Sequence, residues 1–229
     1  MTTTDLWHHY GRTRAGRDRS VPAAFHWTWS QDGGPGPEVL GDLRGRVVGD
    51  LGAGAARHAA YLATRHQPDR VVAVDASPAQ CAMAGDLYGR HTPRLRVLRS
   101  DAVEHLHASP DTYDVLYSVF GAVDFTDPRK LLPAANAALR PRGRLVFSTL
   151  AHHLTGTPAR WDVVASEIPA RTPDREPAVL RRWVLQQPLW TELLDRAGFV
   201  DADVVVLPPV AEGPRAASTL LVTAFRPLP

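Results

Sequence analysis

The sequence predicts a doubly wound α/β fold on a mostly parallel, seven-stranded sheet with an antiparallel strand pair at its C-terminal end. Three observations predict it. Short runs rich in valine and leucine alternate with helical segments from residue 46 onwards, a glycine turn joins the first strand to the first helix, and two strands close the chain. Strands that alternate with helices at this spacing form parallel sheets covered by helices on both faces.

The chain before this pattern forms a separate segment. Residues 1–45 are polar and arginine-rich, and the aromatic run Phe25–Trp29 precedes the glycine- and proline-rich stretch 33–37. Such a stretch marks a flexible break before the main domain, residues 46–229. The aromatic run either forms a lid over a ligand or packs against the domain, because Trp and Phe are commonly buried for packing alone.

A glycine turn follows the first strand. This strand starts at Val47 and reaches Asp50, the chain turns on Gly52 and Gly54, and Ala59–Ala63 continues as a helix. A Cβ at either glycine is expected to obstruct a ligand lying against the chain. The start of the helix offers unpaired N–H groups and the positive end of its dipole. The turn therefore predicts a site for the polar part of a nucleotide-like ligand.

The elements that follow continue the alternation. Residues 70–75 form a second strand, and Ser77 with Pro78 supplies the N-cap and first position of a helix towards Tyr88. Three more strands are predicted from apolar and β-branched runs at 94–99, 114–119 and 143–149.

The remaining elements lie on either side of an interruption. Asp127 caps a helix through Leu139, and Pro133 inside it is expected to kink or delay the helix. The alternation then lapses, and residues 151–187 are interpreted as an insertion near the acceptor site. The last elements are a helix and two strands that can pair antiparallel, at 188–197, 203–207 and 218–225.

Composition limits the classes of function. The 229 residues are 44% hydrophobic and 22% charged, which indicates one globular domain with a full core. The net charge is only +2 and the basic residues are scattered, so no nucleic-acid partner is expected. Cys81 is the only cysteine, and no signal peptide or membrane span is expected, which favours the cytoplasm. No histidine or cysteine spacing predicts a metal site.

Acidic residues end three successive strands. Asp50 closes the first strand, Asp75 closes the second, and Asp101 lies just past the third. Ligands of open α/β sheets bind beyond the carboxyl ends of the strands. A carboxylate after the second strand can accept hydrogen bonds from ribose hydroxyls, and one after the third from an adenine amino group. A single such Asp is more often a helix cap, but three beside the glycine turn indicate a ligand site.

The glycine turn discriminates between two cofactor classes. The dinucleotide fingerprint G-x-G-x-x-G/A requires a small residue where Arg57 stands, so a nicotinamide-dependent oxidoreductase is the less favoured alternative. The pattern Asp50-x-Gly52-x-Gly54 instead resembles motif I of the class I S-adenosylmethionine-dependent methyltransferases, (D/E)-x-G-x-G-x-G, with Ala56 in place of the last glycine.

Three further segments carry the same resemblance. Val71–Ser77 resembles the second motif of that family, and Leu193–Phe199 resembles its L-L-x-x-A-G-F ending. Leu139–Leu145 is similar to its L-(R/K)-P-G-G-x-(L/F) turn, with Arg142 replacing the first glycine. The matches extend from about residue 47 to 225. They imply a Rossmann-like methyltransferase fold, S-adenosyl-L-methionine as cofactor and S-adenosyl-L-homocysteine as product.

The resemblance also implies a cofactor site. It assigns Asp50, Gly52 and Gly54 to the methionine end of the cofactor, and Asp75 with Ala76 to the ribose. It assigns Asp101 with Ala102 to the adenine, and Ser118 with Val119 to the sulfonium.

The chemistry of methyl transfer suggests candidate bases. The sulfonium methyl is already activated, so the protein mainly aligns donor and acceptor and excludes water. A hydroxyl or weakly nucleophilic carbon needs a general base, whereas a free amine does not. Candidate bases are His152 after the fifth strand, Asp124 after the fourth, and His26 in the aromatic run, although each also suits a structural role.

The acceptor is expected to be a small molecule. An apolar wall could form from Trp29, Phe120, Trp161 and Trp183, with core packing as the alternative for each. The segment 118–122 differs from the N-P-P-Y type of enzymes that methylate DNA adenine or protein glutamine. The expected function is methyl transfer to O, N or C of a small molecule in bacterial secondary metabolism. A non-catalytic ligand-binding protein that retains the fold is the alternative from another class.

Overall fold

The computed structural model describes residues 5–10, 20–210, 212–213 and 216–229; the parts of the expected N-terminal segment at 1–4 and 11–19 lie outside this set. A seven-stranded sheet has the order β3-β2-β1-β4-β5-β9-β8. Neighbours among β1 to β5 are parallel, and β9 is antiparallel to both β5 and β8. The predicted fold class is confirmed. The strands of this sheet are β1 (Val47–Leu51), β2 (Arg70–Asp75), β3 (Leu95–Arg99), β4 (Tyr113–Val119), β5 (Leu139–Leu150), β8 (Val200–Leu207) and β9 (Thr219–Phe225).

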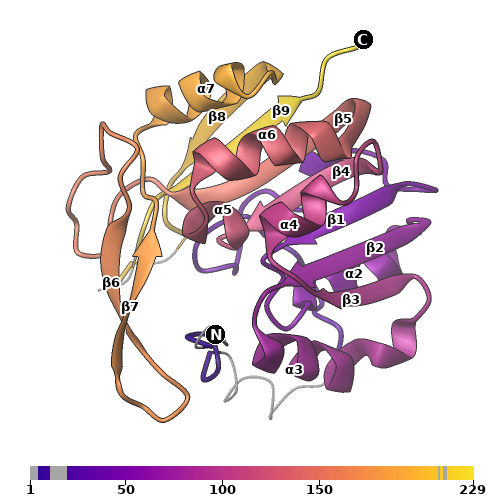
Figure 1. The fold of residues 1–229 in the computed structure, drawn as a ribbon, viewed down its shortest axis with the longest axis horizontal. Helices are drawn as coiled ribbons and strands as arrows, with labels where there is room; N and C mark the ends of the chain where they lie inside the picture. Colours follow the sequence, from indigo (N-terminus) through magenta and orange to yellow (C-terminus); the bar gives the residue numbers. More distant parts are fainter. Residues whose placement is uncertain (1–4, 11–19, 211, 214–215) are drawn as a thin grey trace.

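Helices cover both faces of the sheet (Figure 1). One face packs against α4 (Ala102–His107), α5 (Ala122–Phe125), α6 (Pro128–Ala138) and α7 (Gln187–Arg196). The opposite face packs against α2 (Arg57–Arg65), α3 (Pro78–Tyr88) and the N-terminal segment, which contains the short helix η1 (Pro37–Leu40). A second short helix, η2 (Gly89–His91), follows α3.

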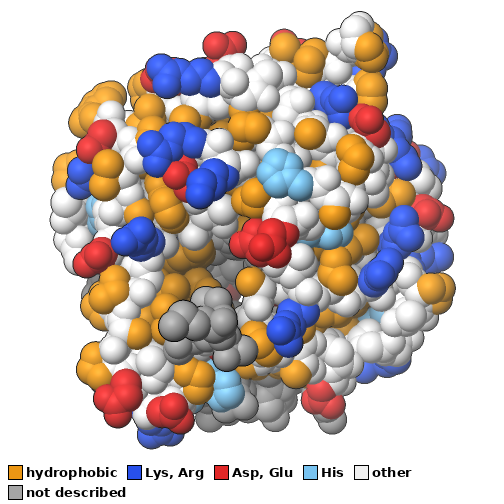
Figure 2. All heavy atoms as spheres, in the orientation of Figure 1, with side chains coloured by type: hydrophobic (Ala, Val, Ile, Leu, Met, Phe, Trp, Pro, Cys, Tyr) orange, Lys and Arg blue, Asp and Glu red, His pale blue; other side chains and the backbone are white. Residues whose placement is uncertain are grey.

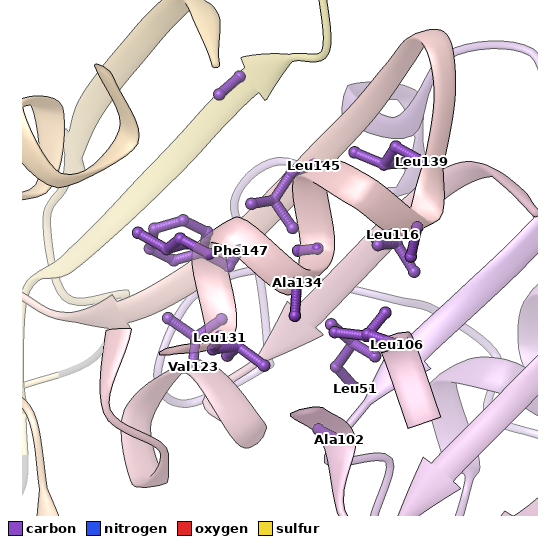
Figure 3. Packing of buried hydrophobic residues seen from close by; sticks show 14 of the residues in the cluster. Leu51, Ala102, Leu106, Leu116, Val123, Leu131, Ala134, Leu139, Leu145 and Phe147 are labelled. Atoms are coloured by element: carbon purple, nitrogen blue, oxygen red, sulfur yellow. The ribbon is translucent and has the colours of Figure 1, made fainter. Parts of the chain in front are cut away.

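Apolar side chains fill the layer between the sheet and α4 to α6. Figure 3 shows Leu116, Leu145 and Phe147 of the sheet lying against side chains of these helices, such as Leu106 and Leu131. Alternate residues of a strand point to opposite faces, so each strand contributes to both helix layers. Because this sheet is buried on both faces, its central strands are nearly continuous apolar runs.

The aromatic run of the N-terminal segment contributes to the second layer. Phe25 and Trp27 are 1% and 0% exposed, and the Trp27 indole N–H donates to the Gly36 carbonyl at 2.8 Å. Trp29 is only half-buried. The packing interpretation therefore applies to Phe25 and Trp27, whereas Trp29 extends towards the ligand end of the sheet.

Helix starts follow the expected capping chemistry. The Ser77 hydroxyl accepts from the Gln80 N–H at 3.1 Å, and the Asp127 carboxylate accepts from the Arg129 N–H at 3.0 Å. The expectation that Pro133 delays α6 is wrong, since α6 begins at Pro128 and continues through Pro133 to Ala138. Proline removes a single hydrogen bond there, and burial of the apolar face of α6 outweighs that loss.

The fifth strand begins at Leu139, earlier than the predicted residue 143. Its register against β4 shifts between the pairs Tyr113–Leu139 and Val115–Arg144, and Arg142 has a φ of +63° inside this irregularity. Ala56 has a φ of +57°. Both residues replace a motif glycine, and both have the left-handed backbone that glycine adopts with the least strain.

The insertion contains a two-stranded antiparallel sheet that the sequence did not indicate. Its strands are β6 (Ser166–Arg171) and β7 (Pro177–Arg182), and they form a hairpin beside the ends of β4 and β5 (Figure 1). Pro169 and Pro177 within these strands lower their strand signal, because proline cannot donate to a sheet ladder. No helix in the described parts of the chain combines the length and apolarity that crossing a membrane requires.

Candidate cofactor and acceptor site

The turns after β1 and β4 pack against each other at the point where strand order reverses. A Cβ on Gly52, whose φ is +75°, would lie 2.2 Å from the backbone nitrogen of Ala122. A Cβ on Gly121 would lie 2.5 Å from the Leu51 carbonyl oxygen. Gly52 is therefore required by the packing of the two turns. At Gly54 the nearest atom is Gln80 Oε1 at 3.6 Å, so this position remains open to a ligand.

Asp75 joins the glycine turn to α3. Its Oδ2 accepts from the Gly54 N–H at 2.8 Å, and its Oδ1 accepts from the Ser77 N–H at 2.9 Å. Burial raises the pKa of Asp75, and the two N–H donors oppose that rise. Each oxygen still has a lone pair that can accept a further hydrogen bond.

Asp50 lies beneath the turn and is 2% exposed. The Tyr117 hydroxyl donates to its Oδ2 at 2.8 Å. Burial raises the pKa of Asp50 to about 7, an effect that Tyr117 opposes and the negative charge of Asp75 reinforces. Asp50 therefore exchanges a proton near neutral pH, which an ordinary aspartate does not.

The remaining cofactor candidates lie at the ends of β3 and β4. Asp101 is exposed and caps α4, since its Oδ1 accepts from the N–H groups of Val103 and Glu104 at 2.8 and 3.1 Å. Ala102 beside it is buried, and Ala76 after β2 is exposed. Ser118 is fully buried and donates to the Leu51 carbonyl at 2.8 Å, while Val119 is half-buried. Ser118 thus ties the end of β4 to the end of β1.

The residues at these strand ends suit the groups of S-adenosylmethionine. The carboxylates of Asp50, Asp75 and Asp101 can accept from an ammonium, ribose hydroxyls and an adenine amino group. Ala56 occupies the N-cap of α2 and supplies no side-chain cap bond, so the positive end of this helix dipole suits an anion such as a carboxylate.

Residues 5–10 extend across the ligand end of the sheet. The Asp5 Oδ2 accepts from the Ser77 hydroxyl at 2.9 Å and from the Ala79 N–H at 3.2 Å. The buried amide of Gln80 donates to the carbonyls of Trp7 and Tyr10, both at 2.9 Å. The N-terminal turn is therefore fixed to the start of α3, next to Asp75.

The same turn reaches the insertion. The Trp7 ring meets Phe125 of α5 edge-on at 4.6 Å between centroids. A ring nitrogen of His9 lies 2.9 Å from the Pro173 carbonyl at the tip of the β6–β7 hairpin. Figure 2 shows the surface hollowed between the hairpin and α4, with hydrophobic side chains around the hollow. The N-terminal turn thus bridges the cofactor side and the insertion side of this face.

A buried ion pair lies on the insertion side. Asp124 is 0% exposed, and its Oδ2 accepts from Nε of Arg182 at 2.9 Å and from Nη2 of the same residue. Burial raises the pKa of Asp124, and the charge of Arg182 and the Thr149 hydroxyl oppose that rise. Arg182 therefore occupies one oxygen of the Asp124 carboxylate, and the other oxygen, Oδ1, is buried without a hydrogen-bond partner among the described residues.

The other proposed bases are also engaged. His152 Nδ1 lies 2.9 Å from the His153 carbonyl, and its Nε2 accepts from the Ser218 N–H at 3.3 Å. His26 Nδ1 lies 3.2 Å from the Gly34 carbonyl in its own loop. Both ring nitrogens of His152 and one of His26 are thus engaged.

The four aromatic candidates do not form one wall. Trp29 and Phe120 meet edge-on at 5.0 Å, whereas Trp183 packs against the core cluster of α4 to α7 and its backbone N–H donates to the Asp124 carbonyl at 2.8 Å. Trp161 is 74% exposed. Arg182, which faces the Trp29 ring at 5.1 Å, was not predicted, because no motif marks it and its neighbours come from distant segments.

Comparison with known proteins agrees with this arrangement. Residues 48–143 match a family model described as a methyltransferase domain. The search of curated proteins produced no match. The chain is similar in structure to an S-adenosylmethionine-dependent methyltransferase from Mesorhizobium loti, with a TM-score of 0.63, 22% identity, and coverage of 82% of this chain and 94% of that one.

Two more solved structures show the same fold. A putative S-adenosylmethionine-dependent methyltransferase from Listeria monocytogenes has a TM-score of 0.60 and 20% identity over 82% of this chain and 94% of its own. A Burkholderia thailandensis 1,6-didemethyltoxoflavin N1-methyltransferase has a TM-score of 0.55 and 24% identity over 80% of this chain and 72% of its own. Residues 48–143 therefore match a methyltransferase domain, and the chain as a whole has the fold of S-adenosylmethionine-dependent methyltransferases.

Proposed function

We propose that the protein transfers the methyl group of S-adenosylmethionine to a small-molecule acceptor. One observation carries the proposal: Asp50, Asp75 and Asp101 lie at the ends of adjacent strands around the open Gly54 turn, and residues 5–10 link this group to Phe125 and, through it, to Arg182. The first part suits the cofactor and the second suits the acceptor. The cofactor part of the proposal follows the superfamily that the chain resembles, and the acceptor part is inferred from this structure.

Each residue has a specific part in this proposal. The bound cofactor supplies an electrophilic methyl group. Asp50 binds the ammonium, Asp75 with Ala76 the ribose, and Asp101 with Ala102 the adenine edge. Gly52, Gly54, Ser118 and Val119 shape the backbone around the methionine end. Residues 5–10 and the hairpin exclude water from the reacting atoms, which aligned methyl transfer requires.

The acceptor is one that reacts without a protein base. Asp124 is paired with Arg182, and both nitrogens of His152 are engaged. An amine nitrogen or an already ionised hydroxyl therefore suits the site best. The Burkholderia relative, whose crystals contain 1,6-didemethyltoxoflavin and S-adenosylhomocysteine, supports a small-molecule acceptor here. The arginine-rich composition, with Lys130 as the only lysine, supports a place in bacterial secondary metabolism, and the single Cys81 supports a cytoplasmic location.

Calorimetric titration with S-adenosylhomocysteine tests the cofactor assignment, with NADH as the control ligand. Micromolar binding of S-adenosylhomocysteine alone is expected. Replacing Asp75 by Ala is expected to weaken this binding by about 1–3 kcal/mol, because a buried hydrogen-bond acceptor for the ribose is lost. Unchanged affinity in a folded Asp75→Ala protein would refute the role of Asp75. Binding of NADH instead would refute the cofactor itself.

The raised pKa of Asp50 predicts a pH dependence of cofactor binding. Below about pH 7 the free protein holds Asp50 protonated, and an ammonium ligand must displace that proton to pair with the carboxylate. Affinity for S-adenosylhomocysteine is therefore expected to fall about tenfold for each pH unit below 7 and to be level above it. Calorimetry across this range measures the slope. The Asp50→Asn variant, which has no proton to release, is expected to bind S-adenosylhomocysteine more weakly and without this slope. A wild-type affinity that does not depend on pH contradicts the assignment of Asp50 to the ammonium.

A further inference from the structure

Five side chains from five separate segments form one continuous chain of contacts on the insertion side. They are Trp7 of the N-terminal turn, Phe125 of α5, Arg182 of β7, Trp29 of the aromatic run, and Phe120 after β4. Trp7 and Phe125 lie 4.6 Å apart, the Arg182 guanidinium carbon lies 5.3 Å from the Phe125 ring and 5.1 Å from the Trp29 ring, and Trp29 and Phe120 lie 5.0 Å apart. The guanidinium therefore makes cation–π contacts with two aromatic rings.

The three nitrogens of the Arg182 guanidinium differ in their hydrogen bonds. Nε and Nη2 both donate to a single oxygen of Asp124. Nη1 has no hydrogen-bond partner among the described residues, and it is not fully sealed from solvent. Arg182 as a whole is only 5% exposed. Nη1 is therefore the nitrogen of this buried cation that keeps contact with solvent and has N–H groups free to donate.

Charge decides which ligand group suits Nη1. Asp124 already balances the charge of Arg182, so a second full anion would leave net negative charge in a buried place. A neutral carbonyl oxygen accepts the same hydrogen bond without that penalty. The half-buried rings of Trp29 and Phe120 favour a flat ring system next to it, since aromatic rings stack on one another.

We propose that the acceptor is a planar, conjugated molecule with a neutral carbonyl oxygen, and that Arg182 selects it by donating from Nη1 to that oxygen. This inference rests on the proposed function, because it names the acceptor class for the same site. Arg182 is here a specificity-determining residue. Asp124 is a positioning residue, because it holds the guanidinium with its Nη1 edge towards the ligand.

Two flat bicyclic phenols test the proposal in the protein saturated with S-adenosylhomocysteine. 7-Hydroxycoumarin has a ring carbonyl, and 2-naphthol has none. Calorimetry is expected to show that the wild-type protein binds 7-hydroxycoumarin at least about tenfold more tightly than 2-naphthol, the effect of one hydrogen bond to a charged donor. Coumarin-3-carboxylate, an anion of the same shape, is expected to bind more weakly than 7-hydroxycoumarin.

Two variants locate the effect. Arg182→Lys keeps a positive charge beside Asp124 but removes the second donor edge, so the preference for 7-hydroxycoumarin is expected to fall to about twofold or less. Arg181→Gln, a change at the exposed neighbour on β7, is the matched control and is expected to keep the preference. Both variants are expected to bind S-adenosylhomocysteine as the wild type does.

The outcomes separate the two proposals. Four results each overturn the acceptor class. The wild-type protein binds the two phenols equally, or it does not bind 7-hydroxycoumarin, or it binds coumarin-3-carboxylate more tightly than 7-hydroxycoumarin, or the preference for 7-hydroxycoumarin survives in Arg182→Lys. If S-adenosylhomocysteine binding is intact in those cases, the proposed function stands. Failure of the wild type to bind S-adenosylhomocysteine overturns the proposed function instead.

Discussion

Replacing Gly52 by Ala is expected to lower the free energy of unfolding by about 2–5 kcal/mol and to abolish cofactor binding. The left-handed backbone at φ +75° disfavours a Cβ by about 1–2 kcal/mol. Backbone atoms of Ala122 and Gly121 at 2.2 and 2.8 Å from the new Cβ add the cost of overpacking, about 1–3 kcal/mol. The clash pushes apart the turns after β1 and β4. Urea denaturation and calorimetry with S-adenosylhomocysteine measure the two effects.

Gly54→Ala is the matched control for this change. Its backbone is also left-handed, at φ +54°, but the nearest atom to an added Cβ is a side-chain oxygen at 3.6 Å. Only the conformational cost of about 1–2 kcal/mol is expected in stability. Cofactor binding is expected to weaken as well, because Gly54 lies where the ligand approaches. Equal loss of stability in the two variants would show that the contact between the two turns is unimportant.

Replacing Asp124 by Ala is expected to destabilise the fold by about 3–5 kcal/mol, because it leaves the charge of Arg182 buried without a partner. The pair is enclosed, with Asp124 at 0% and Arg182 at 5% exposure. Thermal and urea denaturation measure the loss.

Two controls isolate the buried charge as the cause. Asp162→Ala breaks an aspartate–arginine pair on the surface and is expected to cost about 1 kcal/mol or less. The double variant Asp124→Leu with Arg182→Met replaces both charges by apolar groups and is expected to recover most of the stability. If the double variant is as unstable as Asp124→Ala, the packing of Asp124, and not its charge, explains the loss.

The order of the elements in the main sheet could be predicted from the sequence because their signals are local. The valine-rich strand 70–75, the Ser77–Pro78 cap and the glycine turn each need only neighbouring residues. The strand-end positions of Asp50, Asp75 and Asp101 followed from the same alternation, since the carboxyl ends of parallel strands meet at one edge.

The acceptor side could not be predicted in the same way. The contact of Arg182 with Trp29 and the contact of Trp7 with Phe125 join residues that are distant in sequence, and tertiary packing alone brings them together. The raised pKa of Asp50 likewise depends on burial under elements that no local pattern specifies. The hairpin was missed because prolines stand in both of its strands.

The N-terminal turn has a consequence for the order of events in folding. Its hydrogen bonds join Asp5 to Ser77 and His9 to Pro173, so the last of them closes a loop of more than half the chain. Contacts with such large sequence separation form late, after the local strand–helix units, because closing long loops costs entropy first. Residues 5–10 must therefore wait for the hairpin before they complete the site, and the framework of the sheet forms before the enclosure that excludes water.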